Sequence, residues 1–419
     1  KKKDTIKAIN DNNVTIITGG PGTGKTTVIK TIIDIYKQKK YKTVLCAPTG
    51  RAAKRMTETT GEEASTLHRL LEIRKINDDY LKKQDNEYEG MPIDADLIIV
   101  DELSMVDIFL MRYLLKCIYP GTKLVLVGDS DQLSSVGPGN VLKDLILSGK
   151  ITTVHLDKIF RQAAKSKIIL NAHRVNSGMK FLSKEEDTEE TKEDFFFIKE
   201  SSQEAMLNQV ISLCTGRLKK FGDYDFFSIF QVLTPTKKGM LGTKELNKAL
   251  QQVLNPHRDG ENEKSSLGSV YRVQDRVMQI KNNYDMQWEK QNGELGTGVF
   301  NGEMGTILEI DDKNKCVQIK FDDEKTSWYE YSELDQIEHS YSITIHKAQG
   351  SEFDVVIMPI AQSAPMLLTR NLLYTGITRA KKLLIIISTD KIIDFMIQNI
   401  DSKKRNTGLE YKIRMLEKI

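Results

Sequence analysis

The chain has 419 residues, of which 39% are hydrophobic and 28% are charged. This length predicts roughly two to four domains with ordinary buried cores, and no apolar run reaches the roughly 18 residues that a membrane span needs. The 61 basic and 58 acidic residues leave a net charge of +3. That balance neither requires nor excludes nucleic acid, because a local basic groove can coexist with a near-neutral total.

The four cysteines are widely separated and form no C-x-x-C pair, which argues against a cysteine-ligated zinc or iron–sulfur site. They are Cys46, Cys117, Cys214 and Cys316. We expect reduced thiols and a cytoplasmic protein. The chain begins with Lys1 and no apolar leader, so we expect a trimmed sequence without a signal peptide.

From residue 14 to about 156, short apolar strands alternate with helical stretches, which predicts a parallel sheet covered by helices. The expected strands are Val14–Thr18, Thr43–Ala47, Leu97–Val100 and Lys123–Val127. The polar segment Glu72–Ala95 interrupts this alternation. It predicts either a small hairpin or a plain surface loop.

A second α/β series starts with a strand at Phe227–Leu233 and a helix at Gly242–Leu254. Residues 262–340 differ, because short β-type runs there are separated by Asn, Gly and Asp. That spacing predicts a small antiparallel barrel inserted into the second domain. The α/β series resumes with Tyr341–Thr344, Asp354–Ile360 and Lys382–Thr389. Ahead of the whole second series, before Phe227, the apolar run Phe195–Ile198 predicts a further buried strand.

The clearest motif is Gly19–Thr26, a complete G-x-x-x-x-G-K-T between an expected strand and an expected helix. Its backbone amides and Lys25 neutralise phosphate charge, and the Thr26 hydroxyl is suited to ligate Mg²⁺. We therefore expect ATP and Mg²⁺ as cofactors. The expected nucleotide-binding residues are Gly20, Gly22, Thr23, Gly24, Lys25, Thr26 and Thr27.

Two further strand ends supply the groups that hydrolysis needs. The strand Leu97–Val100 leads into Asp101, suited to Mg²⁺, and Glu102, suited to polarise the attacking water. The next strand leads to Gln132, which can sense the γ-phosphate through hydrogen bonds. Each residue alone is weak evidence, but the three motifs support one another.

Two arginines beyond the first α/β series, Arg161 and Arg379, are candidates to contact the γ-phosphate. An arginine finger is worth about 10³–10⁵ in rate. If such an arginine from a second domain reaches ATP held by the first, hydrolysis must open and close the space between them. That arrangement is the physical basis of a motor.

At this point the order of motifs resembles superfamily 1 helicases, and within them the RecD-type helicases of superfamily 1B. The resemblance covers about residues 5 to 390. Besides the phosphate loop, it rests on Ala47–Ala53 (APTGRAA), Val100–Asp107 (VDELSMVD), Gly128–Leu133 (GDSDQL) and Tyr341–Glu352 (YSITIHKAQGSE).

The resemblance implies two RecA-like motor domains of α/β class, the first at 1–156 and the second at 157–261 with 341–419. It implies that 72–95 is a small pin insertion and that 262–340 is an SH3-like β-barrel insertion. Glu352 is expected near the ribose. Single-stranded DNA is expected at Thr49, Thr66, His68, Thr234, Thr344 and His346. Short hydroxyl side chains suit phosphate contacts that do not read bases.

The resemblance also implies an ATP-dependent 5′→3′ DNA helicase and translocase acting in recombination and double-strand-break repair. We expect a monomer that binds single-stranded DNA and junctions, with subunits of a repair complex as further partners. One alternative is a nucleotide-gated DNA-binding subunit with little unwinding, and another is an RNA-directed helicase. The sequence departs from the pattern near Thr5, where the adenine-reading glutamine is missing, and no nuclease-type carboxylate cluster follows Arg379.

Overall fold

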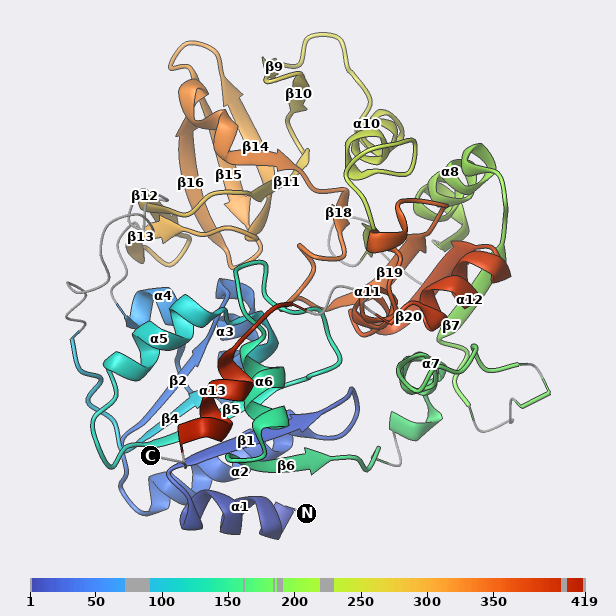
Figure 1. Cartoon of the computed structure of the whole chain (residues 1–419). Coiled ribbons are helices and arrows are strands. Elements are labelled where there is room, and N and C mark those ends of the chain that lie inside the picture. Colours follow the sequence, from blue (N-terminus) through green and yellow to red (C-terminus); the bar gives the residue numbers. More distant parts are fainter. Residues whose placement is uncertain are drawn as a thin grey trace. The chain divides into compact units, whose positions relative to one another are not determined.

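The structure, a computed structural model, describes residues 2–71, 91–160, 163–183, 185–186, 191–218, 230–400 and 405–416 (Figure 1). It divides into two compact units, Lys1–Lys192 with Ile400–Ile419 and Glu193–Asn399. The chain therefore passes between the units twice. No helix in the described ranges is long and apolar enough to cross a membrane.

The first unit is built on a parallel sheet in the order β3-β2-β4-β5-β1-β6. In chain order its strands are β1 (Val14–Gly19), β2 (Thr43–Ala47), β3 (Ala64–Thr66), β4 (Leu97–Val100), β5 (Lys123–Gly128) and β6 (Thr152–Leu156). Along β4, Leu97 and Ile99 enter one hydrophobic cluster while Ile98 and Val100 enter another. Side chains alternate along a strand, so this apolar run is covered on both faces.

Helices supply those two covers. One cluster joins the sheet to α1 (Lys2–Asp11), α2 (Lys25–Gln38) and α3 (Gly50–Thr60). The other joins it to α4 (Leu67–Leu70), α5 (Ile108–Lys116) and α6 (Val141–Ser148). The α/β alternation expected for the first half of the chain is confirmed.

The C-terminal helix α13 (Leu409–Met415) also packs on the first unit, where Leu409 and Ile413 join the cluster that contains α6. Just before it, Arg405 Nη1 donates to the carbonyl oxygens of Gly137 and Gly139, each at 2.7 Å. The sequence predicts 341–419 as part of the second motor domain. By these contacts its last residues lie with the first unit instead.

The second unit contains a parallel sheet in the order β18-β8-β19-β20-β7. Its strands are β7 (Phe195–Lys199), β8 (Phe230–Thr234), β18 (Ser342–Thr344), β19 (Phe353–Pro359) and β20 (Ala380–Ser388). Helices α8 (Gln203–Ser212) and α10 (Thr243–Leu254) pack on one face. On the other, α11 (Arg370–Ile377) comes so close that a Cβ at Gly376 would lie 2.6 Å from Met358 Sδ. Helix α12 (Asp390–Gln398) packs beside α11.

An antiparallel sheet interrupts this second α/β series, as the sequence predicts for residues 262–340. Its strand order is β13-β12-β16-β15-β14-β11-β17, beside a β9-β10 hairpin. The strands are β9 (Glu263–Ser266), β10 (Ser269–Arg272), β11 (Arg276–Gln279), β12 (Asn283–Lys290), β13 (Leu295–Val299), β14 (Met304–Asp311), β15 (Cys316–Phe321), β16 (Lys325–Glu330) and β17 (Ile337–His339). The expected pin lies mostly outside the described residues.

A buried carboxylate joins this inserted sheet to the parallel sheet. Asp275, which is fully buried, accepts hydrogen bonds from Gln251 Nε2 at 2.6 Å and Asn255 Nδ2 at 2.8 Å, both at the end of α10. It also accepts one from the Tyr341 hydroxyl at 2.8 Å and lies 2.9 Å from His339 Nε2. The residues that lead out of the insertion are therefore fixed to α10 through one side chain.

We expect Asp275→Ala to destabilise the second unit by about 3–5 kcal/mol, since removing one partner leaves buried donors without an acceptor. For a unit of this size, that corresponds to a fall of roughly 10 °C in unfolding temperature. Differential scanning calorimetry would measure it. The control is Asp285→Ala, an exposed carboxylate on β12. Equal unfolding temperatures for the two variants would contradict the anchoring role of Asp275.

Candidate functional site

The phosphate loop lies between β1 and α2, as expected. Gly22 and Gly24 have φ angles of +72° and +85°, which glycine adopts without a steric penalty. Gly19 also needs to be glycine, because a Cβ there would lie 2.6 Å from the Leu156 carbonyl oxygen. Helix α2 begins at Lys25, so the free N–H groups of its first turn follow the loop directly and make a ready anion site.

Lys25 is held inside this loop. Its Nζ donates to the carbonyl oxygens of Gly19 at 2.5 Å and Gly20 at 3.2 Å. The Thr23 hydroxyl donates to the same Gly20 oxygen at 2.8 Å. Thr26 is exposed in the first turn of α2, which leaves its hydroxyl accessible to a metal ion.

The acidic pair follows β4. Glu102 is 6% exposed, and its Oε1 lies 3.1 Å from Arg55 Nη2 on α3. The pKa of Asp101 is raised to about 6, mainly by burial and also by the neighbouring Glu102 carboxylate. The positive charges of Arg55 and Lys25 act in the opposite direction. Since Lys25 acts on Asp101, the phosphate loop and the acidic pair share one electrostatic site.

The backbone at Glu102 is unusual. Its φ of +52° places a non-glycine residue in the left-handed region, which costs of order 1–3 kcal/mol and is concentrated at functional sites. The conformation turns the chain sharply at the end of β4. A carboxylate that is buried, paired and held in this way has a well-defined position.

Gln132 lies on the loop after β5, where its Nε2 donates to Asp129 Oδ2 at 3.2 Å. Both side chains are buried. Strand β5 pairs with β1 on one side and β4 on the other. The structure thus brings Lys25, Asp101, Glu102 and Gln132 to the carboxyl ends of three adjacent parallel strands, where α/β sheets bind ligands.

The sequence analysis missed a cover over the phosphate loop. The Phe160 backbone N–H donates to the Gly22 carbonyl at 3.1 Å, and a Cβ at Gly24 would lie 2.1 Å from the Phe160 ring. On helix α7 (Lys167–Asn176), His173 Nε2 lies 3.0 Å from the Pro21 carbonyl oxygen. The only signal in the sequence was an aromatic residue next to Arg161, which itself lies outside the described residues.

These contacts also place residues 163–176 with the first unit, although the sequence predicts that the second motor domain begins at 157. The reason is local. Strands β1 and β6 are neighbours in the sheet. The segment after β6 turns back over the phosphate loop at the end of β1, and α7 packs against the same loop through His173.

Arg379 lies in the second unit at the start of β20. It is 2% exposed and donates to the carbonyl oxygens of Ser351 at 3.0 Å and Thr375 at 3.1 Å. Glu352 is exposed at the start of β19, the strand that pairs with β20. The structure therefore brings Arg379 and Glu352 to neighbouring strand starts, with the guanidinium bound within its own unit.

In the first unit, the expected DNA contacts lie at helix starts. Thr49 caps α3 by accepting from the Ala52 N–H at 3.2 Å, and Thr66 caps α4 by accepting from the Arg69 N–H at 3.1 Å. His68 is half-buried on α4. Since β2 and β3 are adjacent, Thr49, which follows β2, and Thr66, the last residue of β3, lie at neighbouring strand ends.

In the second unit, the expected contacts are of two kinds. Thr234 is fully buried and donates to the Leu241 carbonyl at 2.6 Å, and Thr344 is 6% exposed. Buried side chains of this kind are unavailable to solvent, and the Thr234 bond fixes the loop between β8 and α10. His346 and Lys238 are exposed, and Lys238 lines a hollow of about 90 Å³ with Thr236 after β8. The sequence analysis did not single out Lys238 or Thr236.

Three protein-family domains match the chain. An AAA domain matches residues 2–138, the SH3 domain of ATP-dependent RecD-like DNA helicases matches 246–321, and a UvrD-like helicase C-terminal domain matches 339–387. The SH3 match coincides with much of the inserted antiparallel sheet.

Among curated proteins, the chain is 34% identical over 370 residues to the ATP-dependent RecD2 DNA helicase of Deinococcus radiodurans. That match covers 88% of this chain but 46% of the relative, so the chain spans about half the relative's length. A RecBCD enzyme subunit RecD from Mycolicibacterium smegmatis is 28% identical, over 99% of this chain and 75% of the relative.

Among solved structures, Pif1 helicase from Bacteroides in complex with ADP-AlF3 and single-stranded DNA has a TM-score of 0.54. The match covers 94% of this chain and 93% of the other, at 19% identity. At this identity the similarity concerns the fold.

Proposed function

Because this chain belongs to the RecD-like helicases of superfamily 1B, we propose that it hydrolyses ATP to move 5′→3′ along single-stranded DNA and to separate duplex strands. The observation that carries the proposal is the meeting of Lys25, Asp101, Glu102 and Gln132 at the strand ends of one parallel sheet. A second parallel sheet with its own arginine, Arg379, supplies the second half of a motor.

In this proposal Lys25 and the α2 amides bind the β- and γ-phosphates. Mg²⁺ would be held by the Thr26 hydroxyl and the Asp101 carboxylate, since oxygen ligands of this kind suit that ion. The ion would offset negative charge on the phosphates. Glu102, already fixed by Arg55, takes a proton from the attacking water. Gln132 forms a hydrogen bond with the γ-phosphate, so that the conformation of the loop after β5, on which it lies, depends on whether that phosphate is present.

The DNA-facing part of the proposal rests on half-buried and exposed polar groups at or after strand ends. Thr49 and Thr66 in the first unit use their oxygens as helix caps, which leaves their O–H groups to donate to phosphates. In the second unit, Lys238, Thr236 and His346 offer charge and hydrogen bonds. We propose that the buried Thr234 and Thr344 position these loops. None of the contacts reads a base, as movement along any sequence requires.

The test is steady-state ATPase with and without single-stranded oligonucleotides of DNA and of RNA. Stimulation by DNA alone supports the proposal, and unwinding of a duplex with a 5′ tail but not a 3′ tail supports the direction. Stimulation by RNA would favour an RNA-directed helicase. No stimulation would favour a nucleotide-gated subunit of a repair complex, a reading supported by the similarity to the RecBCD subunit RecD.

We expect Arg379→Ala to lower the turnover number by about 10³-fold or more while ATP affinity changes only a few-fold, as for an arginine finger. Arg379 also makes hydrogen bonds inside its own unit, so the unfolding temperature is measured beside the kinetics. The control is Lys381→Ala, an exposed cation that follows it on β20. An unchanged turnover number with a lower unfolding temperature would show that Arg379 is structural.

The wider setting is proposed on the same family basis. We propose a cytoplasmic protein, active as a monomer on single-stranded DNA and junctions, that serves recombination and double-strand-break repair. Analytical ultracentrifugation with and without a forked DNA substrate tests the monomer. A stable dimer on DNA would contradict it.

A further inference from the structure

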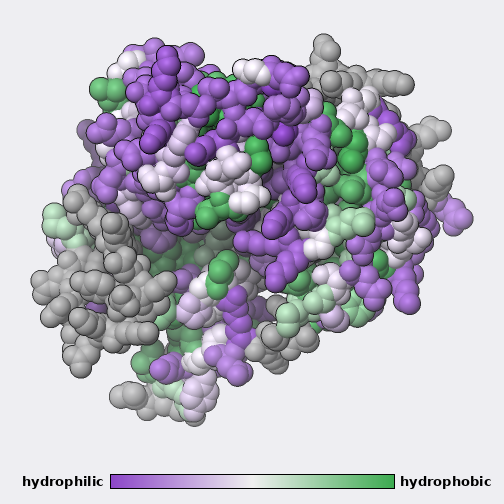
Figure 2. All heavy atoms as spheres, turned by 90° about the horizontal axis from the view of Figure 1, so that it is seen from above, coloured by the Kyte–Doolittle hydropathy of each residue, from purple (hydrophilic) through white to green (hydrophobic). Residues whose placement is uncertain are grey.

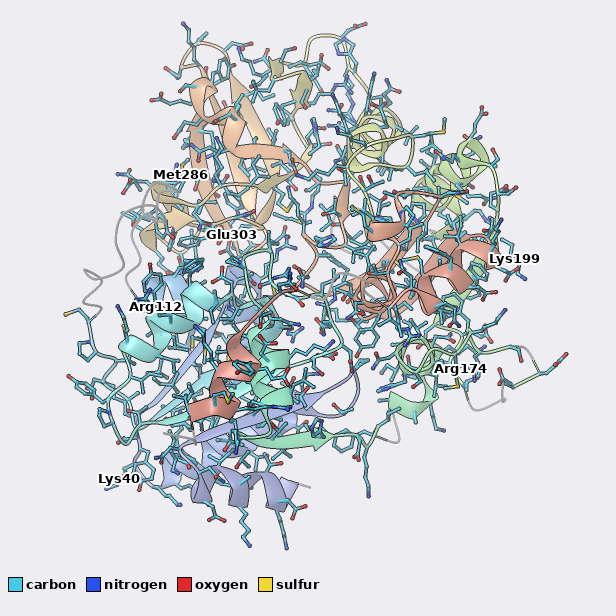
Figure 3. All side chains as sticks on the ribbon, viewed as in Figure 1. Lys40, Arg112, Arg174, Lys199, Met286 and Glu303 are labelled. Atoms are coloured by element: carbon cyan, nitrogen blue, oxygen red, sulfur yellow. The ribbon has the colours of Figure 1, made fainter. Side chains whose placement is uncertain are left out.

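The inserted antiparallel sheet carries a hollow of about 580 Å³ between β12, β16 and their neighbours. Both tryptophans of the chain, Trp288 and Trp328, line it. Trp328 is 44% exposed and Leu295, also in the lining, is 76% exposed, whereas Met286 is buried. Figure 3 labels Met286, which belongs to the strand labelled β12 in the same view in Figure 1. Figure 2 shows hydrophobic side chains as small areas on a mostly hydrophilic face.

The groove has an acidic lining beside one lysine, Lys290, which lies over the Trp288 ring. Four carboxylates line it, from Asp285, Glu289, Glu330 and Glu333, and its lining as the structure describes it includes no lysine or arginine. Glu330 and Glu333 cap the short helix after β16. Asp285 and Glu289 are exposed on the same face of β12. Carboxylates in this number repel phosphates, so the groove is unsuited to nucleic acid.

The Trp288 ring already interacts with a cation of this chain. Lys290 Nζ lies 5.4 Å from the centroid of the Trp288 ring and pairs with Glu294 at 2.9 Å. The chain itself thus places an ammonium group on this ring. A cation over a tryptophan contributes about 0.5–2 kcal/mol, more when it is desolvated. A carboxylate within reach of the same cation adds to that attraction.

The ring of Trp288 is also fixed in place. It lies opposite Gly296 on β13, where an added Cβ would come within 2.3 Å of the ring. The indole therefore lies directly against the backbone of β13, which only glycine permits. A rigid aromatic side chain binds with a smaller loss of conformational entropy than a mobile one.

We propose that this groove, where Trp328 and Leu295 lie among the four carboxylates, binds a short cationic segment of another protein, in which arginine or lysine alternates with apolar side chains. The cationic groups pair with Asp285, Glu289 and Glu330, and one of them lies on the Trp328 ring. The apolar side chains cover Leu295 and Trp328. Strand β13 is an edge strand of its sheet, so an extended segment beside it gains backbone hydrogen bonds as well.

The location of both tryptophans makes a direct test simple, because tryptophan emission, excited selectively over the 14 tyrosines, comes only from two residues that line this groove. The probe is a ten-residue peptide in which four arginines alternate with leucines and valines, and the reference peptide carries glutamate at the four arginine positions. We expect a saturable change in emission with a dissociation constant of about 10–100 µM at low salt for the arginine peptide only. No saturable change with it would overturn the proposal.

Variants separate a specific groove from general charge attraction. Glu289→Lys with Glu330→Lys should weaken peptide binding at least ten-fold, measured by calorimetry. The matched control is Glu309→Lys, an exposed carboxylate on β14 of the same sheet that is not part of the lining. Equal weakening by the control would refute a specific groove. A saturable emission change with a twenty-residue thymidine oligonucleotide would show instead that the groove binds nucleic acid.

Discussion

Replacing Lys25 with alanine should reduce ATP turnover by about 10³-fold or more, a loss of about 4 kcal/mol of transition-state stabilisation. The reason is that Lys25 is the cation held inside the phosphate loop, where its Nζ contacts Gly19 and Gly20. No other lysine of α2 lies at the loop. Phosphate release from ATP, measured with saturating single-stranded DNA, gives the turnover number.

The control for this variant is Lys30→Ala, an exposed lysine on the same helix. It removes the same charge from the chain and should leave turnover within about two-fold. Binding of single-stranded DNA without nucleotide should persist in both variants, because the proposed DNA contacts lie after other strands. Substantial hydrolysis by Lys25→Ala would mean that the nucleotide binds elsewhere.

Replacing Glu102 with glutamine should lower turnover by about 10²–10⁴-fold while nucleotide still binds. Glutamine has the same shape but cannot accept the proton of the attacking water. The position of the side chain matters as much as its charge, since Glu102 is buried, paired with Arg55 and held at a strained φ. A fluorescent ADP analogue measures binding, and phosphate release measures turnover.

Here the matched variant is Glu58→Gln, an exposed carboxylate on α3 near Arg55. It should behave as the unaltered protein in both assays. If Glu102→Gln binds the analogue normally and hydrolyses ATP within three-fold of the unaltered protein, Glu102 is not the base. Loss of nucleotide binding would instead show that the Arg55–Glu102 pair supports the shape of the site.

Much of the fold could be predicted because the buried parallel strands are short apolar runs bounded by polar loops. The expected Thr43–Ala47 and Leu97–Val100 match β2 and β4 in both bounds. Strands with weaker patterns were missed, among them β3 at Ala64–Thr66 and β12 at Asn283–Lys290. In β12 the outward positions are polar and the strand has few apolar residues, so its role depends on pairing with β13 and β16.

The positions of the expected catalytic residues in the first unit were predictable for a similar reason. Asp101 and Glu102 directly follow β4, and Lys25 and Gln132 come within a few residues of the ends of β1 and β5. Parallel strands bring their carboxyl ends to one edge. The buried state of Thr234 was not predictable, because it depends on a hydrogen bond to Leu241 across a turn. The cover formed by Phe160 and His173 depends on how the chain folds back after β6.

The sequence by itself determined which residues we propose for the chemistry, Lys25 in the phosphate loop and the acidic pair Asp101 and Glu102, because these motifs are local and their spacing is tied to strand ends. Only the tertiary structure decided which distant residues hold that chemistry in place. Arg55 on Glu102 and Arg405 on the loop of Gly137 come from other segments. Such contacts join side chains far apart in the chain, so no local pattern records them.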